Sequence, residues 1–200
     1  MSKERAGDTD PATKSSGAHL AYPAWVGKIV TPGERHDEES LMRRVIEVAL
    51  ENVTHTRDHP LGGPFAAIIA TRSGKVLSIG YNEVVPRSDP TAHAEVMAIR
   101  RAGAALKSWK LDPPDDEGVT LLTSCAPCIL CTGAVHWSGI SRVVAAARSA
   151  DAAKAGFVEG PEGFDAPALL AQSGVEYAPD LLRQEALEVF RRYEGTIYNA

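Results

Sequence analysis

Three cysteines and a histidine–glutamate pair carry the residue types that bind metals and move protons. The stretch TSCAPCILC contains Cys125, Cys128 and Cys131 at equal spacing. Upstream, the stretch TAHAEV contains His93 and Glu95. Thiolate and imidazole groups are ligands that Zn²⁺ prefers in proteins. The two stretches together predict a metal site with a carboxylate beside it.

A proline separates the roles of the cysteines. Pro127 suits the first turn of a helix, because its missing N–H would be unpaired there. Cys128 and Cys131 then lie three apart on that helix, point the same way, and have thiolates favoured by the helix N-terminus. Residues that precede a proline are pushed out of the helical region, so we expect Cys125 to end the strand before it. Cys128 and Cys131 are therefore the expected ligands, and Cys125 is either a bystander or a thiol that supports a ligand without binding the metal.

A third protein ligand is needed, because two thiolates alone make a poor zinc site. Among the six histidines, His93 stands at a predicted helix start with Glu95 two residues later. Both side chains reach a site just beyond the helix end if the helix begins near His93. Three protein ligands leave the fourth zinc position for a water molecule, whose pKa falls to about 7. Glu95 is then placed to take a proton from that water.

Two alternatives to this open site remain. A CxxC pair also occurs as a redox pair or as part of a structural zinc site. In the second case Cys125 would be a fourth ligand, and the site would be a closed Cys3His centre that only holds the fold. Glu95 would then have no role.

Apolar patterns around these motifs predict alternating strands and helices. From 37 to 53 the apolar residues fall on one face of a helix. Strands are expected at 65–71, 75–82, 119–124, 141–147 and 175–179, and further helices at 93–106, 127–138, 150–155, 165–172 and 181–194. A helix, a strand pair and then alternating elements indicate an α/β fold, a three-layer α/β/α sandwich with a mixed sheet.

The composition limits which classes of protein this chain can belong to. The chain has 200 residues, of which 44% are hydrophobic and 24% charged, as in an ordinary globular domain. The net charge of -5 and the pI near 5.7 give no reason to expect a nucleic acid partner. All three cysteines lie close together, which argues against a disulfide framework and favours a reducing cytoplasm.

The N-terminal part of the chain differs in composition from the rest. It is polar and lacks the apolar core of a secretory signal, and the apolar stretch that follows is too short to span a membrane. We expect residues 1–36 to form a flexible extension and residues 37–200 to form a single domain.

The motif H-A-E followed by P-C-x-x-C resembles the signature of zinc deaminases. With GGPFAAII and YNEVV, it is similar to the cytidine deaminase-like superfamily from about residue 40 to the C-terminus. DPTAHAE, GAVHWSG, AARSADAAKAGFVEGP and the tail GTIYNA resemble the bacterial guanine deaminase branch. The resemblance implies a mixed five-stranded sheet between helices and one Zn²⁺ per subunit. It also implies a homodimer, in which the C-terminal segment can swap and cover the partner's site.

The same resemblance implies an activity and residue roles. The reaction is hydrolytic deamination of a free purine base, guanine to xanthine and ammonia, with Glu95 relaying protons. Asn82 hydrogen-bonds the purine, and Glu159 reads the guanine edge and assists proton transfer. The remaining substrate contacts are Phe65, Ala94, Trp137 and Tyr198.

One departure bears on the substrate. Ala126 stands where many relatives have glutamate, so a polar contact near the site is lost or replaced. The alternative substrates are guanosine, cytosine or cytidine, an ammeline-type triazine, and adenosine within tRNA. A nucleoside would need room for ribose, so closure of the site by the C-terminal tail discriminates between them.

Overall fold

The structure, a computed structural model, describes residues 20–54, 62–111 and 118–198. The elements run in chain order as α1 (Val26–Ile29), α2 (Glu38–Thr54), β1 (Ala66–Thr71), β2 (Val76–Tyr81), α3 (Val84–Arg87), α4 (Ala94–Leu106), β3 (Val119–Cys125), α5 (Ile129–Ser138), β4 (Arg142–Ala147), α6 (Ser149–Lys154), α7 (Ala166–Gln172), β5 (Glu176–Ala178) and α8 (Arg183–Arg191). The predicted strands and long helices are all present. The short helix α3 falls between the predicted strand at 75–82 and the predicted helix at 93–106.

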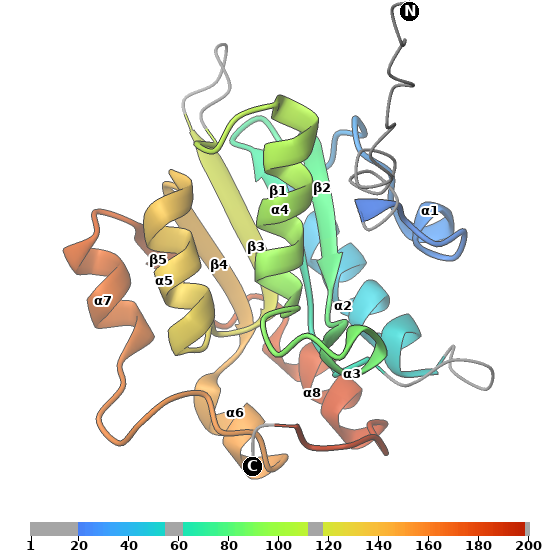
Figure 1. The fold of residues 1–200 in the computed structure, drawn as a ribbon, viewed down its shortest axis with the longest axis vertical. Coiled ribbons are helices and arrows are strands. Elements are labelled where there is room, and N and C mark those ends of the chain that lie inside the picture. The colour runs from blue at the N-terminus through green and yellow to red at the C-terminus, as the bar shows by residue number, and fades with distance from the viewer. Residues whose placement is uncertain (1–19, 55–61, 112–117, 199–200) are drawn as a thin grey trace, which may run out of the picture.

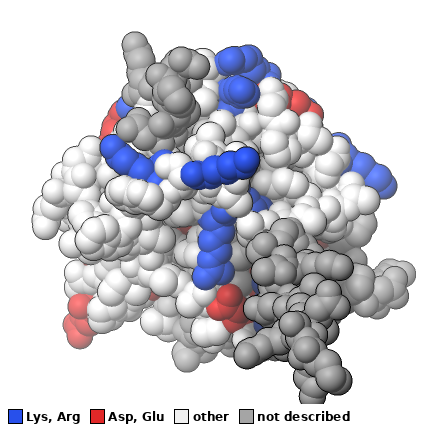
Figure 2. Space-filling view, turned by 45° about the horizontal axis from the view of Figure 1, so that its top comes forward, with Lys and Arg blue, Asp and Glu red and all other residues white. Residues whose placement is uncertain are grey.

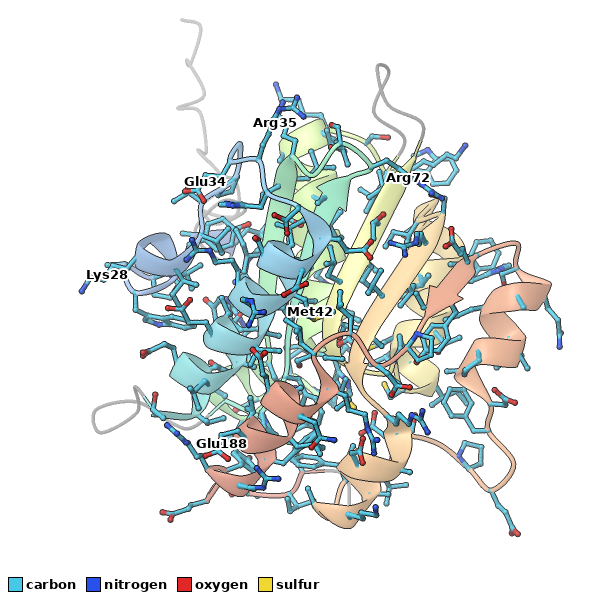
Figure 3. The ribbon with its side chains drawn as sticks, turned by 180° about the vertical axis from the view of Figure 1, so that it is seen from behind. Lys28, Glu34, Arg35, Met42, Arg72 and Glu188 are labelled. Atoms are coloured by element: carbon cyan, nitrogen blue, oxygen red, sulfur yellow. The ribbon has the colours of Figure 1, made fainter. Side chains whose placement is uncertain are left out.

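The strands form one mixed five-stranded sheet in the order β2-β1-β3-β4-β5. β1 pairs antiparallel with β2 and β3, whereas β3, β4 and β5 run parallel. Helices α4 and α5 cover the face seen in Figure 1, and α2 and α8 cover the opposite face seen in Figure 3. The predicted three-layer α/β/α sandwich is therefore confirmed.

The parallel part of the sheet brings the functional segments together. Parallel strands place their carboxyl ends at one edge, where ligands bind in open α/β sheets. β3 ends at Cys125 and leads into the start of α5, while the chain beyond β4 and α6 returns to the same end through Glu159. The N-terminus of α4 lies at this end too, at the bottom of Figure 1. The motifs distant in sequence therefore meet at one edge.

A glycine sets how closely α4 approaches the sheet. A Cβ added to Gly80 of β2 would lie 1.9 Å from the carbonyl oxygen of Ala94. Only glycine leaves room for that carbonyl, because any other residue carries the Cβ. The close packing fixes the first turn of α4, where His93 and Glu95 stand.

The ordered domain begins earlier than the predicted boundary at residue 37. Val26, Ile29 and Val30 are buried in the main core. Tyr22 Oη accepts a hydrogen bond from the backbone N–H of Ile79 at 3.0 Å. β2 is an edge strand, so this segment covers backbone that would otherwise be open, which explains why it packs on the domain. Residues 1–19 of the predicted extension lie outside the described residues.

Within the described residues, no helix has both the length and the apolar character that crossing a membrane requires.

Candidate metal centre and catalytic site

The candidate metal centre lies where α4 and α5 begin. His93 is the N-cap of α4 and Cys128 is the N-cap of α5, and both have extended backbones. The helix of Cys128 was predicted to start at Pro127, but it starts at Ile129, because Cys128 has a ψ of 177° that ends the helical region. Cys131 lies in the first turn, fully buried. The three side chains thus approach one point from two helix ends.

The spacing of these atoms suits a single metal ion. His93 Nδ1 lies 3.5 Å from Cys128 Sγ and 3.7 Å from Cys131 Sγ. The ligand atoms of His93, Cys128 and Cys131 all lie within 4.8 Å of one another. Two sulfurs and an imidazole nitrogen are a donor set that zinc favours, and three ligands leave one tetrahedral position open. The residues present therefore fit zinc in a catalytic rather than a closed arrangement.

Cys125 lies apart from this group. Its Sγ is 3.6 Å from the carbonyl oxygen of Arg148, to which the thiol donates. Burial raises the pKa of Cys125 well above the ordinary value, so the thiol stays protonated. Among the described residues, the metal-binding group comprises His93, Cys128 and Cys131 alone. This geometry disfavours the closed Cys3His site.

The electrostatics of the three ligands single out Cys128 as the thiolate. A hydrogen bond from Cys131 is the largest of the effects that lower the pKa of Cys128 to about 4, and His93 adds to it. Burial raises the pKa of Cys131, and its hydrogen bonds with Cys128 and Glu95 raise it further. Burial opposes the charged form of His93, but contact with Cys128 and the charges of Glu95 and Glu159 together outweigh it and raise the pKa of the imidazole. One thiolate is therefore already favoured, as a metal ligand requires.

Glu95 lies beside the cluster and is nearly inaccessible, with 6% of its surface exposed. Cys131 Sγ is 3.2 Å from Glu95 Oε2, and Thr123 Oγ1 is 3.4 Å from Glu95 Oε1. Burial raises the pKa of this carboxyl above its ordinary value. A carboxyl with a raised pKa is suited to accept and return a proton. Thr123 was not foreseen, although a hydroxyl within an apolar strand was an available signal.

Asn82 is held in one amide orientation. Its Oδ1 accepts hydrogen bonds from the backbone N–H groups of Gly63 at 3.1 Å and Val84 at 3.2 Å. Its Nδ2 donates to Tyr198 Oη at 2.8 Å. A flipped amide would set its N–H groups against two backbone donors, so the network excludes it. Asn82 therefore uses Nδ2 as its donor group, which Tyr198 receives in this structure.

Tyr198 brings the C-terminal tail over the metal centre within one chain. Its ring centroid lies 5.8 Å from that of His93 and 5.5 Å from that of Phe157. Burial raises the pKa of the Tyr198 phenol, which therefore stays neutral. Phe157 is a wall residue that the sequence prediction missed, although it stands two positions before Glu159. The tail covers the site in cis in this structure.

Phe65 lies one ring away from the site. It is buried and contacts Phe157 and Phe190 edge-on, with ring centroids 5.0 and 5.8 Å away. Phe65 thus supports Phe157 from the core.

The other expected residues differ in their placement. Glu159 is half-buried, its carbonyl accepts a hydrogen bond from the N–H of Ile129, and its carboxylate contributes to raising the pKa values of His93 and Tyr198. Ala94 is fully buried and its side chain belongs to the core, so only its backbone is available to a ligand. Trp137 is 76% exposed and packs against His136 near the far end of α5. The structure therefore does not bring Trp137 to the site, because a full helix length separates it from Cys128.

Comparisons with known proteins place this arrangement in a family. Residues 35–147 match the cytidine and deoxycytidylate deaminase zinc-binding region. Guanine deaminase from Bacillus subtilis is 40% identical over 121 residues, which cover 60% of this chain and 71% of that protein. A tRNA-specific adenosine deaminase from Aquifex aeolicus is 34% identical over 135 residues, 67% of this chain and 84% of that protein.

Solved structures agree with the sequence comparison. Guanine deaminase from Nitrosomonas europaea superposes with a TM-score of 0.78 at 34% identity, covering 88% of this chain and 94% of that one. Further solved structures, at 33 to 35% identity, hold 2,6-diaminopurine or, in variants of a glutamate and an asparagine, 8-azaguanine. The chain belongs to the cytidine and deoxycytidylate deaminase family and is a zinc-dependent aminohydrolase that resembles guanine deaminases.

Proposed function

We propose that the protein deaminates guanine to xanthine and ammonia. The observation that carries the proposal is the open His93, Cys128 and Cys131 group with the buried Glu95 at its side. A closed structural zinc site would have no use for a carboxyl in this position. In the reaction the oxygen of water bonds to the ring carbon that bears the amine, and the amine leaves as ammonia.

His93, Cys128 and Cys131 would hold the zinc ion, which when bound lowers the pKa of a coordinated water and so prepares it for attack. Glu95 takes a proton from the attacking water and delivers it to a ring nitrogen. It then takes the second proton, from the oxygen now bonded to the ring carbon, and delivers it to the leaving amine. Thr123, 3.4 Å from Glu95 Oε1, restrains the carboxyl while it does so. Tyr198 and Phe157 exclude bulk water from the same space.

Asn82 supports a purine substrate. Its Oδ1 is occupied by two backbone donors, so its Nδ2 is the group left to meet the ring. A ring that offers an acceptor there is therefore preferred, and guanine carries acceptors at N7 and O6. In the structure Nδ2 donates its hydrogen bond to Tyr198 Oη. When the base binds, Nδ2 would donate either to both partners or to the base in place of Tyr198.

Glu159 supports guanine more specifically. It lies in the chain segment that follows α6, and the charge of its carboxylate helps to raise the pKa values of His93 and Tyr198. We propose that it accepts hydrogen bonds from the amino edge of guanine and assists proton transfer. The altered asparagine and glutamate of the relative studied with 8-azaguanine are separated by the same number of residues as Asn82 and Glu159. That agreement supports a shared pair of substrate contacts.

We also propose that the protein is a homodimer. Large apolar side chains are exposed on the outer side of α5 and α7, namely Ile129, Leu130, Trp137 and Leu169. Figure 2 shows broad uncharged areas on the molecule. Exposed apolar patches of this kind mark association surfaces, so Trp137 would meet the partner rather than the substrate. Sedimentation of wild type and Trp137→Glu tests this, and a wild-type monomer at micromolar concentration would contradict it.

The three thiols favour a reducing compartment. Cys125, Cys128 and Cys131 are all free and buried. Oxidation of Cys128 or Cys131 would remove a zinc ligand. We therefore place the protein in the cytoplasm, where thiols stay reduced.

Adenosine within tRNA is the second candidate substrate, because tRNA-specific adenosine deaminases are among the relatives. Closure of the site by Tyr198 counts against it, since an attached ribose and chain must leave the pocket. A tRNA substrate also predicts binding that weakens steeply with salt.

The test is ammonia release by purified, zinc-loaded protein on guanine, guanosine, cytosine, cytidine, adenine, adenosine and ammeline. Glu95→Gln with retained zinc is the control for a contaminating activity. Guanine is expected to be turned over fastest, with guanosine far slower. Preference for a nucleoside or a pyrimidine would overturn the proposed substrate, and ammonia from none of them would overturn the proposed activity on a free base.

A further inference from the structure

Asn52 is a buried amide that connects the opposite layer of the sandwich to the substrate side. It stands on α2 and is 7% exposed. Its Nδ2 donates to the carbonyl oxygens of Gly63 at 2.9 Å and Asn82 at 3.0 Å. Both N–H groups of the amide are thereby used. One side chain thus joins two loops that are separated along the chain.

The composition of α2 makes this residue unusual. The other buried residues of the helix are apolar, and Asn52 is the polar exception among them. Burying an amide costs free energy unless its hydrogen bonds are replaced. Here the bonds go to the loops that carry the substrate contacts and not to the helix itself. These hydrogen bonds indicate that an amide stands at position 52 because of the substrate-contact loops and not because of α2 itself.

Two glycines allow the close approach that these bonds need. A Cβ on Gly62 would lie 2.3 Å from the carbonyl oxygen of Asn82 and 2.4 Å from Asn52 Nδ2. A Cβ on Gly63 would lie 2.9 Å from a ring carbon of Tyr198. Side chains at either place would force the loops apart. We call Asn52, Gly62 and Gly63 the clamp.

The clamp acts on the bond that orients Asn82. Gly63 donates its N–H to Asn82 Oδ1, and Asn52 holds the carbonyl of Gly63 and the carbonyl of Asn82 itself. The donor and the acceptor of the orienting bond therefore sit on backbone segments fixed by one amide. We propose that Asn52 is a positioning residue that keeps Asn82 Nδ2 aimed at the substrate ring. The inference rests on the proposed function, because it concerns the substrate contact of Asn82.

The experiment compares Asn52→Ala with Val45→Ala, both buried positions of α2. Val45 lies in the core about two helical turns before Asn52, so its variant reports loss of stability alone. Asn52→Ala is expected to lower kcat/KM for guanine about tenfold, mostly by raising KM, with zinc content unchanged. Val45→Ala is expected to lower the melting temperature while kcat/KM stays within about twofold of wild type.

A double-variant cycle separates positioning from a general effect on structure. If Asn52 acts through Asn82, then Asn52→Ala costs nothing further in an Asn82→Ala background. Full additivity of the two losses would overturn the inference. So would an unchanged KM in a folded Asn52→Ala protein.

Gly62→Ala disturbs the clamp at its glycine side. It tests the inference independently in case Asn52→Ala does not fold. It is expected to raise KM like Asn52→Ala, and a folded Gly62→Ala protein with wild-type KM would count against the clamp. A wild type that leaves guanine unchanged would contradict the proposed function instead. The cycle is then run on the base of the panel that wild type turns over fastest, where the same non-additivity is expected.

Discussion

The metal centre and the substrate-reading side of this site are built in different ways. His93, Cys128 and Cys131 stand at the starts of two helices. At each helix start the functional residues are close in sequence, with Glu95 two positions after His93 and Cys131 three positions after Cys128. Asn82 and Tyr198 are far apart in the chain and lie on a loop and a tail joined by one hydrogen bond. The first region has rigid supports, and the second depends on contacts that bring distant segments together.

This difference separates chemistry from selection. The helix ends fix the atoms that bind zinc and move the proton, and the deaminase family shares those parts. In the function we propose, the loop of Asn82 and the tail of Tyr198 select which ring is accepted. Substitutions at the helix ends should therefore abolish activity on every substrate, whereas those on the loops should shift affinity and preference.

The largest effect is expected from losing a zinc ligand. Cys131→Ser should lose both zinc and activity, because two remaining ligands bind zinc poorly. Cys125→Ser, six positions away in the same stretch, should keep one zinc per chain and most of its activity. Metal analysis beside ammonia release checks both. Loss of zinc from Cys125→Ser would instead support a closed Cys3His site with Cys125 as the fourth ligand.

Glu95→Gln should have the next largest effect. The amide keeps the shape of the side chain but cannot relay a proton, so kcat should fall about 10²- to 10⁴-fold. Zinc content should not change, because Glu95 is not among the metal-binding group. Turnover and bound zinc are measured on the same sample. Near-normal kcat would assign the proton transfer to another group.

Asn82→Ala should act on affinity and preference more than on chemistry. It removes the donor to the ring and leaves the N–H groups of Gly63 and Val84 without their acceptor. A loss of about 10- to 100-fold in kcat/KM is expected, with zinc retained. Kinetics on guanine and on a poor substrate of the panel check this. An equal loss of kcat on both substrates would contradict the assignment of Asn82 to substrate preference.

Tyr198→Phe should have the smallest effect. It removes the hydroxyl that accepts from Asn82 but keeps the ring against Phe157, so KM should rise about threefold. Because burial raises the pKa of Tyr198, its phenol is neutral over the ordinary assay range, and the effect should not vary with pH. A pH series on both proteins tests this, and a variant effect that appears only at high pH would show that the phenol ionises.

The contrast also explains which parts could be foreseen from the sequence. Periodicity located the strands and long helices, because their apolar residues face the core in regular patterns. The metal group was foreseen because His93 and the CxxC pair carry rare chemistry at helix starts. Motifs say little about tertiary contacts, so Phe157, Thr123 and Asn52 were missed.

The errors have physical causes of the same kind. Trp137 was assigned to the pocket from resemblance alone, yet α5 carries it away from the metal centre to an exposed position. The N-terminal segment was expected to be flexible up to residue 36, but its few apolar residues, with Val26 and Val30 among them, pack into the core. Burial by distant partners is not encoded in local composition.

The most direct test measures xanthine formed from guanine by wild type and Asn82→Ala, each with bound zinc determined. The account predicts rapid conversion by wild type, a loss of about 10- to 100-fold in kcat/KM for Asn82→Ala, and one zinc per chain in both. A zinc-loaded wild type that leaves guanine unchanged would contradict the proposed function. A variant with wild-type kcat/KM would contradict the assignment of substrate selection to the loop of Asn82.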